Sequence, residues 1–371
     1  MLECEIDEKA TEISYEADEM EGRQMSIKSI QLKNFTVFNE LAIEFSSGVN
    51  VFIGENGTGK THILKVLYAF CNHELECADD ETPIIHSGFD LRLKEYFQNA
   101  SYSKLFHRSF TDINTLIQNA PINISVGTQD EVRDFSIINY SHDHRYHEML
   151  GGSYTPKKRT PSVYIPAKEM LTHSGFEKDI LERNFPFDAT LIDILNKAGV
   201  STLKNLSSDM QKLLGEIAKI IGGKVVYQSD RYYIDKGRGV LVEFRAEAEG
   251  HKKLGLLYRL IETGNIKKGS VLLWDEPEAN MNPKLMPIVA KTLLELSRSG
   301  VQIFIATHDY NLMKYFSIAK KAEDDVIFFS LYKQENEAHV LCEHEDDYDK
   351  LTNNAIIDAE ISLLEDEIEG V

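Results

Sequence analysis

Eight consecutive residues have the types and spacing that could hold a phosphate chain. They read Gly54, Glu55, Asn56, Gly57, Thr58, Gly59, Lys60 and Thr61, a complete match to the P-loop pattern. Glycines let such a loop wrap so that its backbone N–H groups point inward, and the helix that follows directs its positive end to the same place. We expect Lys60 to reach the β- and γ-phosphates of a nucleotide and the Thr61 hydroxyl to bind Mg²⁺.

A second group of reactive side chains follows the apolar segment 270–274. Asp275 and Glu276 are adjacent acids at its end, which is the arrangement of a Walker B motif. We expect Asp275 to hold Mg²⁺ and Glu276 to polarise the attacking water, as a general base or an orienting group. Taken alone, the pattern fits a buried strand with an acidic exit turn equally well, but a P-loop in the same chain favours the catalytic interpretation.

A third candidate is His308, which comes just after the apolar segment 303–306. Ligands of open α/β sheets lie beyond the carboxyl ends of the strands, where this histidine could hydrogen-bond a γ-phosphate and report its presence. A lone histidine at such a place is more often structural. Its order in the chain, after the P-loop and the acid pair, favours the functional interpretation.

The elements that would position these residues alternate between strands and helices. Hydrophobic spacing predicts a strand before the loop and a helix after it, then helix 249–263, strand 270–274, helix 284–298, strand 301–306 and helix 309–318. Alternating segments predict antiparallel strands at 27–32 and 41–45, a hairpin or meander at 224–244, and helices within 176–221. The predicted fold is α/β: a P-loop head with a central, mostly parallel sheet, antiparallel N-terminal strands and a helical lid insert.

This pattern divides the chain into five parts. They are an acidic N-terminal extension (1–24), an N-terminal lobe with the P-loop (25–74), a partly helical insert or lid (75–221), a C-terminal lobe with the acid pair and the histidine (222–342), and an acidic tail or helix (343–371).

The negative charge of the chain is concentrated at its two ends. The formal net charge is -20; residues 1–24 carry nine acids and two bases, and residues 333–371 carry thirteen acids and two bases. The body between them is therefore close to neutral, and a nucleic-acid-binding face on it remains possible.

No apolar run approaches the ~20 residues that cross a bilayer, so we expect no membrane contact. Four scattered cysteines fit a reducing cytoplasm.

Together these motifs resemble those of a known family. The P-loop, the segment 275–283 and the pair Thr307-His308 are similar to the SMC/RecF/OLD-like branch of ABC ATPases, and most similar to compact bacterial ATP-binding proteins classed as AAA_15 or AAA_21. The segment 30–35 resembles the first strand of that branch, and the segment 165–169 stands where its Q-loop enters the lid.

The resemblance implies that two copies of the chain close on ATP and Mg²⁺. In this family a signature helix of one subunit covers the nucleotide of the other, and the candidate here begins with Ala248, Glu249 and Gly250. The serine of the usual Leu-Ser-Gly-Gly pattern is missing, which leaves its hydroxyl contact in question. Asn280 belongs to the candidate D-loop, which lines the facing subunit.

The predicted function is that of an ATP-hydrolysing switch that forms a homodimer or higher oligomer. We expect it to control a separate effector, such as a nuclease or toxin, or to act on DNA, and the family resemblance suggests bacterial antiviral defence. One alternative is a non-hydrolysing ATP-dependent scaffold or sensor subunit. Another is the nucleotide-binding subunit of a transporter, which the missing serine and the sequence Glu-Pro-Glu-Ala argue against.

Overall fold

The structure is a computed structural model of the 371-residue chain. The residues that it describes are 26–73, 88–98, 105, 121–140, 145–151, 160–174, 188–334 and 339–370. The predicted acidic extension at 1–24 lies outside them. Within the described part, no helix is long and apolar enough to span a bilayer.

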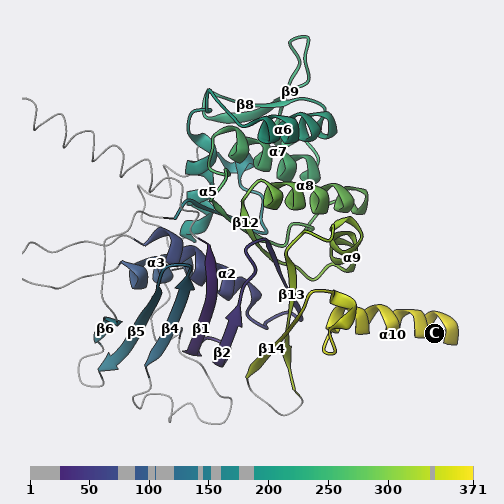
Figure 1. The fold of residues 1–371 in the computed structure, drawn as a ribbon. Helices are drawn as coiled ribbons and strands as arrows, with labels where there is room; N and C mark the ends of the chain where they lie inside the picture. Colours follow the sequence, from purple (N-terminus) through teal and green to yellow (C-terminus); the bar gives the residue numbers. More distant parts are fainter. Residues whose placement is uncertain are drawn as a thin grey trace, which may run out of the picture.

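A six-stranded sheet forms the centre of the molecule (Figure 1), with the strand order β14-β13-β3-β12-β11-β7. Five strands run parallel, and β14 pairs antiparallel with β13 at one edge. The strands are β3 (Val49–Gly54), β7 (Ser162–Ile165), β11 (Val271–Asp275), β12 (Gln302–Ala306), β13 (Val326–Lys333) and β14 (Val340–Glu345). Every residue of β3, β7, β11 and β12 is buried, as expected of parallel strands covered on both faces. The predicted mostly parallel sheet is confirmed.

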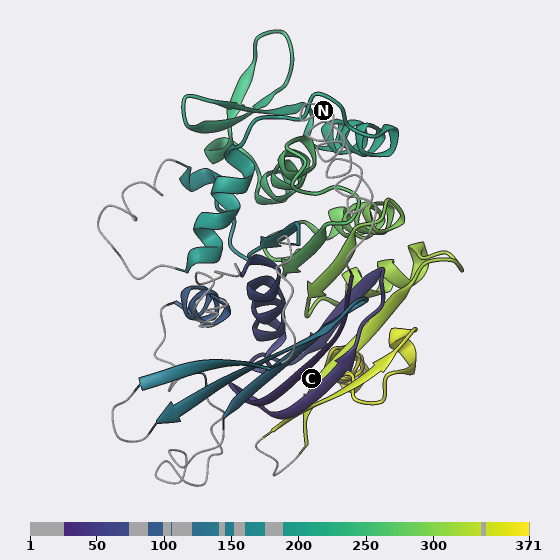
Figure 2. The same cartoon turned by 60° about the vertical axis from the view of Figure 1, so that its left-hand side comes forward.

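A second sheet is antiparallel and lies beside the first (Figure 2), with the order β2-β1-β4-β5-β6. Its strands are β1 (Ile27–Phe35), β2 (Phe38–Glu44), β4 (Ile122–Thr128), β5 (Val132–Tyr140) and β6 (Arg145–Gly151). Ile30 and Leu32 point into the core from β1, whereas Gln31 between them is exposed. This period-two alternation is what the sequence predicted for the N-terminal strands, and they are confirmed.

Helices cover both faces of the central sheet. They are α2 (Lys60–Asn72), α3 (Phe89–Tyr96), α5 (Ala189–Gly199), α6 (Ser208–Ile221), α7 (Glu249–Glu262), α8 (Met286–Arg298), α9 (Tyr310–Ala319) and α10 (Ala355–Glu369). The described residues also include the short 3₁₀ segments η3 (Leu171–His173), η4 (Phe244–Ala246), η5 (Pro283–Leu285) and η6 (Tyr348–Lys350). The predicted helices at 249–263, 284–298 and 309–318 are present as α7, α8 and α9.

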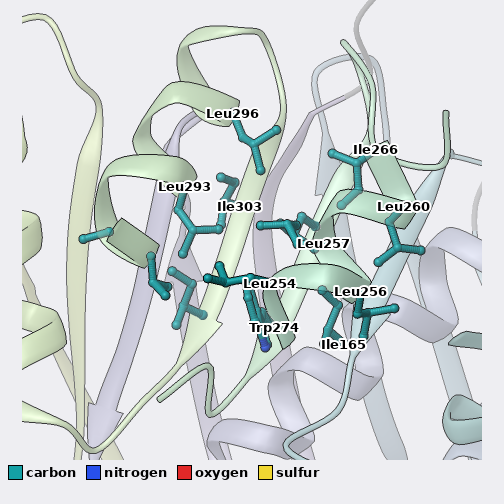
Figure 3. Close-up of a cluster of buried hydrophobic side chains, with 14 of the residues drawn as sticks. Ile165, Leu254, Leu256, Leu257, Leu260, Ile266, Trp274, Leu293, Leu296 and Ile303 are labelled. Atoms are coloured by element: carbon teal, nitrogen blue, oxygen red, sulfur yellow. The ribbon is translucent and has the colours of Figure 1, made fainter. Parts of the chain in front are cut away.

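Alternate residues of β11 point into two different hydrophobic cores. Leu273 packs in a cluster with α2 and with the antiparallel sheet, whereas Trp274 packs in a cluster with α7 and α8 (Figure 3). In that second cluster Leu254 and Leu257 of α7 meet Trp274 from one side. Both cores are fully desolvated around β11, so the backbone that leads to Asp275 is held from both faces.

A small third sheet confirms the meander predicted at 224–244. Its order is β10-β9-β8, and all its pairs are antiparallel. The strands are β8 (Lys224–Gln228), β9 (Arg231–Asp235) and β10 (Leu241–Glu243).

The segment 75–221, predicted as one insert, contributes strands to both large sheets. β4 pairs with β1, and β7 pairs with β11. Its helical part is present as α5 and α6. The strands inside this range thus belong to the head itself, and the boundaries of the predicted domains stay a prediction.

Candidate functional site

Three neighbouring parallel strands end at the same edge of the central sheet. β12 lies between β3 and β11, so the carboxyl ends of all three strands are side by side. β3 leads into the P-loop, β11 ends on Asp275, and β12 leads to Thr307 and His308. The structure therefore brings together the three motifs that the sequence singled out from distant parts of the chain.

The P-loop has backbone geometry that favours glycine at Gly54, Gly57 and Gly59, and two of these glycines also lie against other elements. Gly54 has a φ of 138°, and a side chain there would lie 2.2 Å from the carbonyl oxygen of Leu331. Gly59 has a φ of 92° and directly precedes α2; a side chain there would lie 2.4 Å from the ring of Phe38. These two glycines let the loop fold closely against β13 and β2.

Lys60 is the first residue of α2 and is almost fully buried. Its ammonium donates to the carbonyl oxygens of Gly54 (2.7 Å) and Glu55 (2.8 Å), so it lies across the loop. Burial lowers the pKa of Lys60, and the carboxylates of Glu276 and Asp275 oppose that shift. The loop thus surrounds a cationic group, as a site for phosphate requires.

Thr61 joins the P-loop helix directly to the acid strand. Its hydroxyl lies 3.1 Å and 2.9 Å from the two carboxylate oxygens of Asp275. The hydroxyl of Tyr164, on β7, donates to the same carboxylate at 3.1 Å. Burial raises the pKa of Asp275, and the hydrogen bonds from Thr61 and Tyr164 oppose that shift. The Thr61 hydroxyl and the Asp275 carboxylate therefore face each other beside the P-loop.

Glu276 has a left-handed backbone conformation, with a φ of 46°. Its N–H donates to the carbonyl oxygen of Ala306 at 2.8 Å, which ties the turn to β12. The ammonium of Lys253, on α7, donates to the carbonyl oxygens of Glu276 (2.9 Å) and Pro277 (3.3 Å). The backbone of Glu276 is therefore held on both sides. Its side chain is about one-third exposed and accessible to a ligand.

Glu278 holds the histidine that follows β12. One of its carboxylate oxygens accepts from the Thr307 hydroxyl (2.8 Å) and from the backbone N–H of His308 (3.1 Å). The Nδ1 atom of His308 lies 3.6 Å from that oxygen and 3.7 Å from a carboxylate oxygen of Glu276. Burial raises the pKa of Glu278. His308 is thus placed beside the acid pair.

The predicted signature segment begins a helix, as expected. α7 starts at Glu249, and its N-cap residue Ala248 is exposed and has no side-chain cap. Gly250 is buried: a side chain there would lie 2.6 Å from Leu285 and 3.3 Å from Met281, next to Asn280. α7 therefore packs against the predicted D-loop of its own chain. The roles of Ala248, Glu249, Gly250 and Asn280 toward a nucleotide stay predictions.

Comparisons with known proteins agree with this geometry. A family model described as "AAA domain, putative AbiEii toxin, Type IV TA system" (AAA_21) matches residues 72–314, which include the acid pair and His308. The chain belongs to this family. This match supports the resemblance to ABC-type ATPases of the SMC/RecF-like branch that the sequence predicted.

Curated relatives share short stretches with this chain. The DNA replication and repair protein RecF of Cytophaga hutchinsonii is 36% identical over 83 residues, which cover 22% of each chain. The RecF protein of Pediococcus pentosaceus is 46% identical over 44 residues, 12% of each chain. The chain thus matches about a fifth of the length of these relatives, or less.

Solved structures show the same fold over most of the chain. The Smc head bound to the C-winged helix domain of ScpA has a TM-score of 0.52 at 14% identity, covering 86% of this chain and 97% of that one. An Smc head domain with an extended coiled coil, bound to the C-terminal domain of ScpA from Pyrococcus furiosus, has a TM-score of 0.51 at 14% identity, covering 93% and 100%. At this identity the likeness concerns the fold alone.

Sequence reasoning assigned no individual role to four residues of the site: Tyr164, Lys253, Glu278 and Thr307. Tyr164 and Lys253 contact the acid pair from positions 111 and 23 residues away, a relationship that no local spacing reveals. Glu278 and Thr307 lie inside segments that the sequence did single out. Their available signal was position: Glu278 follows Glu276 by two residues, and Thr307 directly precedes His308.

Proposed function

We propose that this ATPase binds ATP and Mg²⁺ at the shared edge of β3, β11 and β12 and hydrolyses the nucleotide. The observation that carries the proposal is the hydrogen bond between Thr61 and Asp275, which joins the P-loop to the acid strand. In this proposal the N–H groups of residues 54–61 and the Lys60 ammonium bind the phosphates.

The side chains at the mouth of the loop fit Mg²⁺. This ion prefers oxygen ligands and is held in nucleotide sites by one or two protein groups together with phosphates and waters. Thr61 and Asp275 supply a hydroxyl and a carboxylate on facing elements. Among the described residues, no cluster of three or more His, Cys, Asp and Glu side chains could hold a metal by itself. A magnesium ion would neutralise phosphate charge during the reaction.

Glu276 and His308 are the proposed catalytic side chains. The Glu276 carboxylate is accessible, while its backbone is tied to Lys253 and to Ala306. A carboxylate held in this way can orient a water and accept its proton. His308, held by Glu278 beside that carboxylate, is positioned to contact the γ-phosphate.

The proposal includes a composite site between two copies of the chain. Ala248 and Glu249 begin α7 with backbone N–H groups that no side chain caps, a suitable end for binding an anion supplied by another copy. Asn280 lies beside this helix start on the loop that Gly250 contacts. ATP would then act as a signal, because the closed pair gains contacts that the ADP state lacks.

The proposed output of this switch is control of a separate effector protein in the cytoplasm, such as a nuclease or toxin, in bacterial antiviral defence. The toxin in the family description supports an effector. Action on DNA is the second candidate, supported by the RecF names of the curated relatives. The five-part division of the chain is likewise proposed.

Turnover and binding measured on one pair of proteins test the proposal. The wild-type ATPase should bind ATP with Mg²⁺ and release phosphate, whereas Glu276→Gln should keep the affinity, lose turnover by roughly 100-fold or more and accumulate as an ATP-bound dimer. Binding without turnover in the wild type, alone or with DNA, would favour the non-hydrolysing scaffold instead. Binding of duplex DNA that weakens with salt would support the second output.

A further inference from the structure

Among the described residues, the contacts that anchor α10 lie at its first turn. Asn354 caps the helix through the N–H of Ile357, and its amide also donates to the carbonyl oxygen of Tyr348. The preceding residue, Asn353, donates to the Glu343 carboxylate through its backbone N–H (2.7 Å) and its side chain (2.9 Å). Ile356 is buried in the core that contains Trp274. The base of α10 is therefore fixed to the central sheet.

The rest of α10 extends away from the body of the molecule (Figure 1), and every residue from 358 to 370 is exposed. Ile361, Leu364 and Ile368 are 48%, 56% and 85% exposed, although solvent exposure of such side chains is unfavourable. Together with half-buried Ile357, they recur at intervals of four, three and four residues. This spacing places all four on one stripe of the helix, in the d, a, d, a positions of a heptad.

The residues that flank this apolar stripe are all acidic. Asp358, Glu360, Glu365 and Glu367 occupy the e and g positions on its two sides, and the segment from 355 to 369 contains six acids and no Lys or Arg. Two copies of α10 packed through the stripe would oppose acid to acid across their interface, which disfavours self-association. A surface with Lys and Arg along an apolar groove would satisfy both features.

We propose that the stripe formed by Ile357, Ile361, Leu364 and Ile368 is the docking site for a partner protein that presents an apolar groove edged by Lys and Arg. The inference rests on the proposed function only in that it gives the switch a separate protein to control. Because α10 is joined to the central sheet at its base, a partner held there would be tied to the ATP-binding head. Apolar contacts with the stripe provide most of the binding affinity, and the flanking acidic residues determine which partner is selected.

Designed peptides supply a defined probe for this surface. The full chain is titrated with a helix-forming peptide that has Leu at the a and d positions and Lys at e and g, and with a matched peptide that has Glu at e and g. We expect the Lys peptide to bind at least roughly tenfold more tightly at low salt. Ile361→Gln with Leu364→Gln should weaken that binding by roughly tenfold or more without changing the charge.

Leu363→Gln is the matched control, because Leu363 is 61% exposed on the same helix but lies off the stripe. Its binding should equal that of the wild type. Equal affinity for the two peptides, or equal binding by the wild type and the double variant, would overturn the proposal. So would a nucleotide-free dimer of the wild type that the double variant abolishes, since a second copy would then be the occupant. ATP affinity, measured on the same proteins, reports separately on the proposed function.

Discussion

The Lys253 ammonium donates to the backbone carbonyl of Glu276 at 2.9 Å, so the first half of α7 is bonded to the turn that carries the proposed catalytic acid. Lys253 lies one helical turn after Gly250, in the segment proposed to meet the nucleotide of a second copy. A shift of α7 caused by that nucleotide would therefore move the Glu276 backbone. Through this bond, closure of the pair and hydrolysis would be coupled.

Replacing Lys253 should slow hydrolysis more than it weakens binding. In Lys253→Met the Glu276 and Pro277 carbonyls lose their donor, and we expect kcat to fall by roughly 10- to 100-fold while ATP affinity changes little. Lys252→Met is the control, because the neighbouring Lys252 bonds Glu249 instead (2.6 Å). An equal loss of kcat in both variants would show that the effect belongs to the helix and not to the Lys253 bond.

Lys253 should also leave a signature in the pH dependence of stability. Burial lowers the pKa of Lys253 from 10.5 to about 8. Between these values the unfolded chain binds more protons than the folded one, so the contribution of Lys253 to the free energy of unfolding rises as the pH rises through this window. We therefore measure the free energy of unfolding of the wild type and of Lys253→Met by urea denaturation. The wild-type value minus the variant value should increase from pH 8 to 10. A constant difference would contradict the lowered pKa of the buried Lys253 side chain.

Thr307 should matter for stability through Glu278. Thr307→Val keeps the shape of the side chain but leaves a buried carboxylate without its 2.8 Å donor, so the free energy of unfolding should drop by about 1–3 kcal/mol. The loss should shrink at acidic pH, because burial raises the pKa of Glu278 and its protonated form needs the donor less. Thr352→Val removes an exposed hydroxyl–carboxylate bond to Glu343 and should cost about 0.5 kcal/mol or less. Similar losses at both sites would disprove the special role of Glu278.

Two glycines of the P-loop should differ in their tolerance of alanine. Gly57 and Gly59 both have positive φ, but a side chain at Gly57 meets nothing within 4 Å, whereas one at Gly59 meets Phe38 at 2.4 Å. Gly57→Ala should therefore cost about 1–2 kcal/mol from backbone strain alone. Gly59→Ala should cost more and should displace the loop from β2. Thermal unfolding of the two variants would give the order, and the reverse order would contradict the described loop.

The motifs and the order of the elements could be predicted from the sequence because both are local. The alternation of apolar segments with Gly54, Asp275 and His308 at strand ends fixed a parallel sheet with its site at one edge. The contacts of Lys253 and Tyr164 depend on how α7 and β7 pack, which no local spacing encodes. The sequence also did not show that β4 and β7, inside the expected insert, belong to the two large sheets. Their partners β1 and β11 lie far away in the chain, and such pairing leaves no local pattern.

The proposed ATP site is tested most directly by calorimetric titration of ATP into the wild type, Thr61→Val and Asp275→Asn, each with Mg²⁺ and with a chelator. The wild type should bind more tightly with Mg²⁺ than without it. Each variant should lose most of that gain while keeping its magnesium-free affinity, because Lys60 and the loop backbone remain. Variants that respond to Mg²⁺ as the wild type does, or a wild type with no affinity for ATP under either condition, would contradict a shared site at Thr61 and Asp275.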